Sequence, residues 1–200
     1  MPSIILASAS PRRAELLQQI GVEFSVLPAD IDETPVTGEN VRHYVERMAR
    51  EKSLKVAAAS PESLVLGADT SVVLDGIILG KPVSCNEAVA TLRQLSGKTH
   101  QVLTAVALAS GVGCKSRLVI TEVRFRDLSD VEITRYVATG EPMDKAGSYG
   151  IQGLGGIFVR ELRGSYSAVV GLPLQETAAL LADAGYPVWK NWSSRLESQT

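Results

Sequence analysis

The segment from Leu64 to Leu74 most constrains the fold that this chain can adopt. Most of its residues are apolar and several are β-branched, which predicts a strand. The dipeptide Asp75-Gly76 follows directly and is a strong signal for a two-residue hairpin turn, so Ile77–Leu79 should be the returning strand. The rest of the chain alternates between strand-like and helix-like stretches, and this alternation predicts an α/β protein.

The other elements are expected from apolar periodicity and from capping and turn signals at their ends. Predicted strands span residues 4–7, 24–27, 101–109, 117–125, 158–162 and 167–170. Predicted helices run from a Ser10-Pro11 start to Gly21, from Asn40 to Ala59, from an Asn86 cap to Gly97, from a Ser129/Glu132 capping box to Gly140, and from Leu174 to Gly185. The tail over residues 187–200 is polar and is expected to be frayed.

The composition is that of an ordinary folded protein. Hydrophobic residues make up 45% of the 200 residues, which excludes a wholly disordered chain and suffices for a real core in one domain or two small lobes. Lys and Arg number 20 against 22 Asp and Glu, which gives a net charge of −2. This balance argues against a general binder of nucleic-acid polymers, although a few local cations could still hold a small anionic ligand.

No segment approaches the roughly 18 apolar residues needed to span a bilayer. The N-terminal region is apolar at Ile4–Leu6 and basic only at Arg12 and Arg13, which is the reverse of a secretory signal. Two cysteines, Cys85 and Cys114, are too few for a disulfide framework, so reduced thiols are expected. We therefore expect a cytoplasmic protein with no membrane partner.

Two arginines stand where a helix would normally carry acidic residues. Arg12 and Arg13 fall in the first turn of the predicted helix, where the dipole favours Asp or Glu. An anion bound at the helix N-terminus would explain them, and Ser8 and Ser10 could add hydroxyl donors. The stretch then indicates a phosphate cradle, although it lacks the glycines of a P-loop. Two solvated arginines are the simpler alternative.

Two further charged residues interrupt apolar surfaces. Lys52 falls in the middle of the apolar arc of the predicted 40–59 helix, so it must snorkel, pair with a buried carboxylate or line a cleft. Asp69 lies inside the apolar strand, where a carboxylate is costly unless it is paired or binds a metal. Gly67 leaves room beside Asp69 for a ligand or for another stretch of backbone.

Asp69 has two candidate partners in the sequence. Counting back from the hairpin turn places Thr70 opposite Lys81, and a twist or bulge near Gly80 could bring Asp69 to the same site, so a structural ion pair between Asp69 and Lys81 is one explanation. The other is a bound metal. Separately, Asp30, Asp32 and Glu33 form an acidic cluster just after a strand, and acidic oxygens suit Mg²⁺ or Mn²⁺, which need only one or two carboxylates beside phosphate oxygens. Acidic loops are also often simply solvated, so this signal is weak by itself.

The loop Gly147–Gly153 is dense in glycine around one amide side chain, that of Gln152. Glycine lets a backbone approach a ligand closely, and an amide can both donate and accept, so Gln152 could recognise a base edge. An ordinary turn is the alternative. His43 and His100 lack partners at metal-ligand spacing and are interpreted as incidental.

Together these residues resemble the Maf-like nucleoside triphosphate pyrophosphatases. The motifs that carry the resemblance cover nearly the whole chain, in order. They are Ser8-Ala9-Ser10-Pro11-Arg12-Arg13 with Glu15-Leu16-Leu17, Arg50-Glu51-Lys52, Gly67-Ala68-Asp69-Thr70, Leu79-Gly80-Lys81-Pro82, Leu95-Ser96-Gly97, residues 145–153 and Gly171-Leu172-Pro173-Leu174.

The resemblance implies hydrolysis of a nucleoside triphosphate to a monophosphate and pyrophosphate. Ala68-Asp69-Thr70 is similar to the dTTP/UTP branch, whereas the 7-methyl-GTP branch typically has Ser-Asp-Gln there. We expect Asp69 to accept a proton from water in the presence of a divalent cation, Mg²⁺, Mn²⁺ or Co²⁺. We expect catalysis from Asp69, Lys52, Lys81 and Glu33, substrate binding and specificity from Ser8, Arg12, Arg13, Thr70 and Gln152, and metal binding from Glu33 and Asp69.

The implied fold is a single α/β domain over residues 1–200. It would be an elongated, twisted mixed sheet flanked by helices, in two lobes with a central cleft, and it could form a homodimer. Two other functions stay open: the same chemistry on 7-methyl-GTP or another modified nucleotide, and a nucleotide-binding regulator of septum formation. Release of pyrophosphate from a panel of triphosphates distinguishes them.

Overall fold

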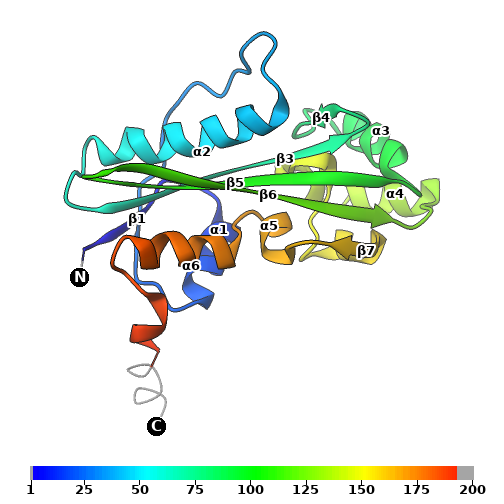
Figure 1. The fold of residues 1–200 in the computed structure, drawn as a ribbon. Coiled ribbons are helices and arrows are strands. Elements are labelled where there is room, and N and C mark those ends of the chain that lie inside the picture. The colour runs from blue at the N-terminus through cyan, green and yellow to red at the C-terminus, as the bar shows by residue number, and fades with distance from the viewer. Residues whose placement is uncertain (1, 193–200) are drawn as a thin grey trace. The chain divides into compact units, whose positions relative to one another are not determined.

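Seven strands of the computed structural model form an open, twisted sheet in the order β2-β1-β3-β5-β6-β7, with β4 paired to β3 (Figure 1). The pairs β1–β2 and β1–β3 are parallel, whereas β3–β4 and β6–β7 are antiparallel, so the sheet is mixed as expected. The strands are β1 (Ile4–Leu6), β2 (Ser25–Val26), β3 (Leu64–Leu74), β4 (Ile77–Leu79), β5 (Thr99–Ser110), β6 (Gly113–Phe125) and β7 (Val159–Arg163).

The hairpin between β3 and β4 has the predicted bounds and register. Leu74 pairs with Ile77, and Val72 pairs with Leu79. Asp75 and Gly76 both have positive φ, +50° and +81°, which is the conformation that a type I′ turn requires. The register therefore follows directly from the two turn residues.

The structure describes residues 2–192. They form two compact units, each with its own helices. Unit 1 comprises Met1–Asp69, Thr104–Leu118 and Gly171–Thr200, and unit 2 comprises Thr70–Leu103 and Val119–Val170. The α-helices are α1 (Pro11–Gln19), α2 (Val41–Ala57) and α6 (Leu174–Asp183) in unit 1, and α3 (Cys85–Leu95), α4 (Asp130–Val137) and α5 (Tyr166–Val170) in unit 2.

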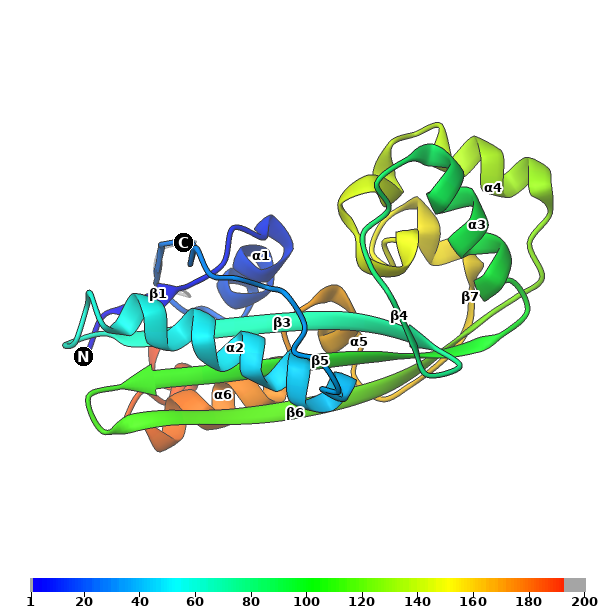
Figure 2. The same cartoon turned by 90° about the horizontal axis from the view of Figure 1, so that it is seen from above.

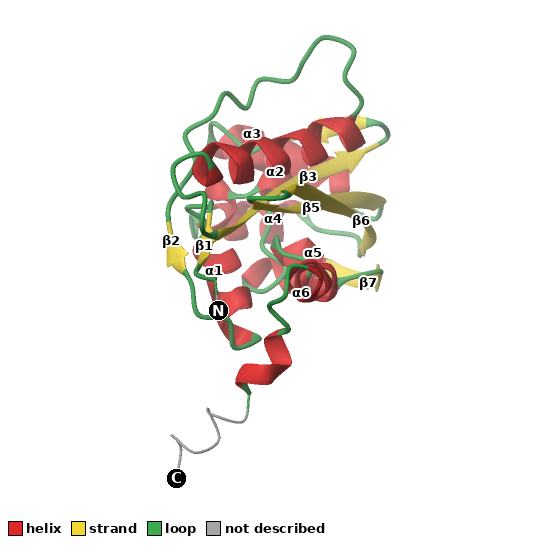
Figure 3. Ribbon diagram, turned by 60° about the vertical axis from the view of Figure 1, so that its left-hand side comes forward, coloured by secondary structure: helices red, strands yellow, loops and turns green. Residues whose placement is uncertain are grey.

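In unit 1, α2 covers one face of the strands, and α1 and α6 cover the other (Figure 3). Val56 of α2 packs in one cluster with Ile5 and Val65 of the sheet. Gly67 of β3 lies against this helix so closely that an added Cβ would stand 2.3 Å from the carbonyl oxygen of Ala49. The absence of a side chain at this position therefore determines how near α2 can lie to β3.

In unit 2, α3 and α4 lie side by side (Figure 2). Short 3-10 helices follow them: η1 (Glu141–Asp144), η2 (Ala146–Ser148) and η3 (Leu154–Phe158). The core is rich in aromatic rings; Phe125, Tyr149 and Phe158 meet in edge contacts with centroids 4.8 to 5.9 Å apart. The predicted capping box of Ser129 and Glu132 opens α4.

Three sequence-based expectations are wrong in detail. Residues 167–170 are helical in α5 rather than a strand, because the Ser165 hydroxyl accepts the N–H of Ala168 and caps a turn. The cap of α3 is Ser84, whose hydroxyl accepts the N–H of Glu87, rather than Asn86. The strands β5 and β6 extend beyond their predicted ends up to a tight turn.

The expected frayed tail is ordered in its first part. After Pro187 the chain forms the 3-10 helix η4 (Val188–Asn191), and the indole N–H of Trp192 donates to the carbonyl oxygen of Ile20 at 2.9 Å. Residues 193–200 lie outside the described residues. No helix in the described part of the chain is long and apolar enough to cross a bilayer, and both cysteines are free thiols.

Candidate active site

The ammonium group of Lys52 joins two carboxylates in unit 1. Its Nζ lies 2.8 Å from Oδ1 of Asp69 and 2.8 Å from Oε1 of Glu33. Lys52 and Asp69 are both 8% exposed, whereas the Glu33 side chain is 56% exposed. The sequence left three possibilities for Lys52: snorkelling, pairing with a buried carboxylate, or lining a cleft. The structure shows the pairing, and the carboxylate is that of Asp69, the other charged residue that interrupts an apolar surface.

The approach of α2 to β3 brings this ion pair together. Lys52 projects from α2, and Asp69 follows two residues after Gly67 on β3. A Cβ at Gly67 would also lie 2.7 Å from the backbone nitrogen of Ser53, so only glycine permits this spacing. The space beside Asp69 is therefore used by the backbone of a helix, one of the two uses expected for Gly67.

Burial raises the pKa of the Asp69 carboxyl above its ordinary value. The positive charges of Lys52 and Arg13 oppose this shift, and the negative charge of Glu33 adds to it. A carboxylate whose charge is stabilised mainly by one lysine, in a largely dry position, is a better proton acceptor than a solvated aspartate. Asp69 is thus suited to remove a proton from a nearby water.

The start of α1 adds a second cation. Arg13 donates from Nε to the carbonyl oxygen of Gly171 at 2.8 Å and from a terminal nitrogen to the Ser8 hydroxyl at 3.1 Å. Burial lowers the pKa of the guanidinium, and Asp69 and Glu33 counteract it. Ser10 occupies the N-cap position but its side chain makes no capping hydrogen bond, and Pro11 follows at N1 as predicted. The first turn of α1 therefore begins without a side-chain cap and carries two arginines, a combination that suits an anion.

The acidic loop that carries Glu33 is anchored to α2. The hydroxyl of Tyr44 donates to the backbone oxygen of Glu33 at 2.9 Å. Arg47 donates to the backbone oxygen of Thr34 at 3.2 Å and binds the Glu39 carboxylate at 2.7 Å. Neither anchor was predicted, because a tyrosine and an arginine at helical spacing are indistinguishable in sequence from a packed and a solvated residue.

The two carboxylates that bind Lys52 fit a divalent cation that is shared with a substrate. Both acceptor oxygens lie 2.8 Å from the ammonium nitrogen of Lys52, so the two carboxylates face one point that is occupied by a positive charge. Mg²⁺ and Mn²⁺ prefer such oxygen ligands and complete their shell with water and phosphate. Among residues 2–192 there is no group of three or more His, Cys, Asp or Glu side chains placed to enclose an ion.

Three predicted site residues belong to unit 2. Thr70 is partly buried and is the first residue of β3 in this unit, while Lys81 and Gln152 are exposed. The N–H of Gly147 donates to the carbonyl oxygen of Gly80 at 3.2 Å, which places the glycine loop beside the residue that precedes Lys81. The structure thus brings together Ser8, Arg13, Glu33, Lys52 and Asp69 in unit 1, and connects the Lys81 and Gln152 segments in unit 2.

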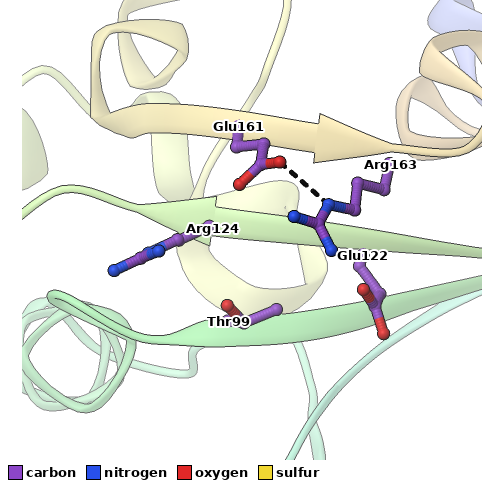
Figure 4. Close-up of a pocket in the computed structure, with 5 residues that line it drawn as sticks. All are labelled: Thr99, Glu122, Arg124, Glu161 and Arg163. Atoms are coloured by element: carbon purple, nitrogen blue, oxygen red, sulfur yellow. Dashed lines mark hydrogen bonds and ion pairs between the residues drawn. The ribbon is translucent and has the colours of Figure 1, made fainter.

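Unit 2 also has a surface pocket on the sheet that none of the predicted site residues lines (Figure 4). Thr99, Glu122, Arg124, Glu161 and Arg163 line it, and Glu161 accepts a hydrogen bond from Arg163 at 2.8 Å. The two acidic and two basic side chains give the pocket no net charge, and both members of the Glu161–Arg163 pair are exposed. The pocket therefore has neither a buried charge nor an excess of one sign that would select a charged ligand.

Comparison with known proteins matches almost the entire chain. A family model described as "Maf-like protein" matches residues 3–184. The dTTP/UTP pyrophosphatase of Aromatoleum aromaticum is 55% identical over 199 residues, covering 92% of this chain and 97% of that protein. The dTTP/UTP pyrophosphatase of Alcanivorax borkumensis is 57% identical over 189 residues, covering 94% and 98%. The Staphylococcus aureus Ham1 structure, at 16% identity and a TM-score of 0.46 over 62% of this chain and 72% of that chain, is too distant to bear on activity.

Proposed function

This chain belongs to the Maf-like protein family, and we propose that it is a nucleoside triphosphate pyrophosphatase that hydrolyses dTTP and UTP to the monophosphate and pyrophosphate. The observation that carries the proposal is the Glu33–Lys52–Asp69 cluster, in which one ammonium group joins two carboxylates that also interact with the positive charge of Arg13 in α1. Relatives at 55% and 57% identity, named dTTP/UTP pyrophosphatases, support the choice of substrate.

The proposed reaction adds water to the α-phosphorus. Asp69 accepts one proton of the attacking water, the bond from the α-phosphorus to the bridging oxygen breaks, and pyrophosphate leaves. Lys52, Lys81 and the arginines of α1 offset the negative charge of the phosphates, which is greatest in the transition state. A divalent cation held by Glu33 and Asp69 would supply further charge neutralisation when bound.

Recognition of the base is assigned to Thr70 and Gln152. The Gln152 amide has both a donor and an acceptor, as the edge of thymine or uracil requires. The nucleotide pool on which this activity would act is cytoplasmic, and we expect the protein to work there. The homodimer and the central cleft implied by the resemblance stay predictions.

The proposal is tested by release of pyrophosphate from dTTP, UTP, CTP, ATP, GTP and 7-methyl-GTP, with Mg²⁺, Mn²⁺ or EDTA. We expect metal-dependent turnover of dTTP and UTP with little action on purines. Turnover of 7-methyl-GTP instead would keep the chemistry and overturn the substrate assignment. Tight binding of a triphosphate without release of pyrophosphate would favour a nucleotide-binding regulator.

A further inference from the structure

A carboxylate and a phenol in unit 2 hold the glycine loop on both sides of Gln152. Glu141, in η1, accepts the N–H of Leu154 at 2.9 Å on one oxygen. Its other oxygen accepts the N–H of Gly155 at 3.0 Å and the hydroxyl of Tyr136 at 2.9 Å. Tyr136 in turn accepts the N–H of Gly150 at 3.1 Å. The backbone is therefore fixed two residues before Gln152 and two and three residues after it.

The contacts of Glu141 and Tyr136 with the backbone, which we call the clamp, explain why Gly153 and Gly155 carry no side chain. A Cβ at Gly153 would lie 2.5 Å from a carboxylate oxygen of Glu141, and one at Gly155 would lie 2.8 Å from the Tyr136 hydroxyl. A side chain at either position would push the carboxylate or the phenol off the backbone N–H groups that it binds. Gly153 and Gly155 thus mark the close approach of Glu141 and Tyr136 to the backbone.

The Glu141 carboxylate is well suited to bind backbone N–H groups. Partial burial works against its charge, but the N–H groups of Gly155 and Leu154 and the Tyr136 hydroxyl more than compensate and hold the pKa of Glu141 below its ordinary value. Hydrogen bonds to an ionised acceptor are the stronger kind. The clamp therefore restrains the loop more than neutral partners would.

Gln152 lies between these fixed points with its side chain exposed. Within the described part of the chain its amide makes no hydrogen bond to protein, so it is available to a ligand. A glutamine on a mobile loop would lose side-chain and backbone entropy when it bound a ligand. Because the backbone around Gln152 is already fixed, the entropic cost of binding is smaller.

We propose that Glu141 is a positioning residue for base recognition: with Tyr136 it fixes the backbone around Gln152, so that this amide meets the nucleobase in one orientation. The inference rests on the proposed function and names a residue that sets its specificity without contacting the substrate. Glu141 then affects the discrimination between bases more than the rate of the chemical step.

The test compares kcat and KM for dTTP, UTP, CTP and ATP in the wild type and in Glu141→Gln. The glutamine keeps the size of the side chain but has one acceptor oxygen and an NH₂ group that would face a backbone N–H. We expect kcat/KM for dTTP and UTP to fall about tenfold, mainly through KM, with the values for CTP and ATP changed by less than about twofold.

Two further variants and one control sharpen the measurement. Glu161→Gln, which alters an exposed glutamate paired with Arg163 on β7, should leave all four substrates unaffected. Tyr136→Phe removes one hydroxyl of the clamp and tests the proposal if Glu141→Gln does not fold. Glu141→Gln in a Gln152→Ala background should cause no further loss of base discrimination, because residues that act through one another are not additive.

Hydrogen exchange of the Gly150, Leu154 and Gly155 amides gives a readout that is independent of turnover, and we expect it to accelerate in Glu141→Gln but not in Glu161→Gln. Equal losses of kcat/KM for every base, or unchanged discrimination, would overturn the proposal. A wild type that hydrolyses none of the triphosphates would instead refute the proposed function, and the exchange data would still report whether the clamp exists.

Discussion

Lys52 in unit 1 and Glu141 in unit 2 are both charged side chains that hold several partners at once, but the partners differ. Lys52 binds two carboxylates, and burial leaves Asp69 with a raised pKa. Glu141 binds two backbone N–H groups and a phenol, and its pKa is lowered. In the first arrangement burial favours the protonated form of a carboxyl group, whereas in the second hydrogen bonds favour the ionised form.

The largest expected effect comes from removing the proton acceptor. Asp69→Asn keeps the shape of the side chain and a partner for Lys52, but the amide cannot accept a proton, so turnover of dTTP should fall by about 10²–10⁴-fold. Pyrophosphate release measures the loss, and circular dichroism checks the fold. Asp183→Asn, at an exposed residue in unit 1 that lies 3.7 Å from Lys115, is the matched control. If Asp69→Asn turned over dTTP as fast as the wild type, Asp69 would not be the proton acceptor, and it would not differ in this respect from Glu141.

A second variant alters the spacing on which the Lys52 cluster depends. Gly67→Ala would place a Cβ 2.3 Å from the Ala49 carbonyl oxygen, so α2 must move away from β3. We expect the free energy of unfolding in urea to fall by about 3 kcal/mol. Gly111→Ala, where the nearest atom to the added carbon is 3.8 Å away, should change it little. Equal stability of the two variants would show that the helix tolerates displacement.

His100 is a buried titratable residue in unit 2. Burial lowers the pKa of His100 from 6.5 to about 4, and its Nε2 lies 2.9 Å from the Tyr149 hydroxyl. Between those pH values the unfolded chain binds a proton that the folded chain does not, so stability is full above pH 6.5 and falls as the pH drops towards 4. The loss reaches about 3 kcal/mol.

Urea unfolding at pH 7 and at pH 4 measures this loss, and the comparison with His100→Phe isolates it, because the variant lacks the titrating ring. His43→Gln, at an exposed histidine in unit 1, should keep the pH dependence of the wild type. An identical pH dependence in His100→Phe would show that the buried imidazole does not contribute.

The sequence was most informative where local chemistry decides the structure. The β3–β4 hairpin follows from Asp75 and Gly76, and the start of α4 follows from Ser129 and Glu132, because both signals act within a few residues. Lys52 and Asp69 could each be singled out as misfits. Their pairing could not be derived, since it depends on the approach of α2 at Gly67, a contact between segments distant in sequence.

The contacts of Glu141 with the backbone after Gln152 could not be predicted from the sequence either. The loop glycines were conspicuous, but Glu141 resembles any acidic residue after a helix, and nothing local indicates that its carboxylate faces Leu154 and Gly155. Residues 167–170 were assigned to a strand because they are short and apolar, and the serine cap from Ser165 makes them helical instead. Propensity fails where one side-chain hydrogen bond decides the local geometry.

The bonds from Arg13 to Gly171 and from Trp192 to Ile20 have a consequence for synthesis on the ribosome. They join the first helix of unit 1 to segments made more than a hundred residues later, whereas unit 2 lies wholly within residues 70–170. A nascent chain can therefore complete unit 2 before unit 1 has all its parts. The residues Glu33, Lys52 and Asp69 are translated early, but Arg13, whose charge acts on both carboxylates, reaches its partner only when Gly171 has been made.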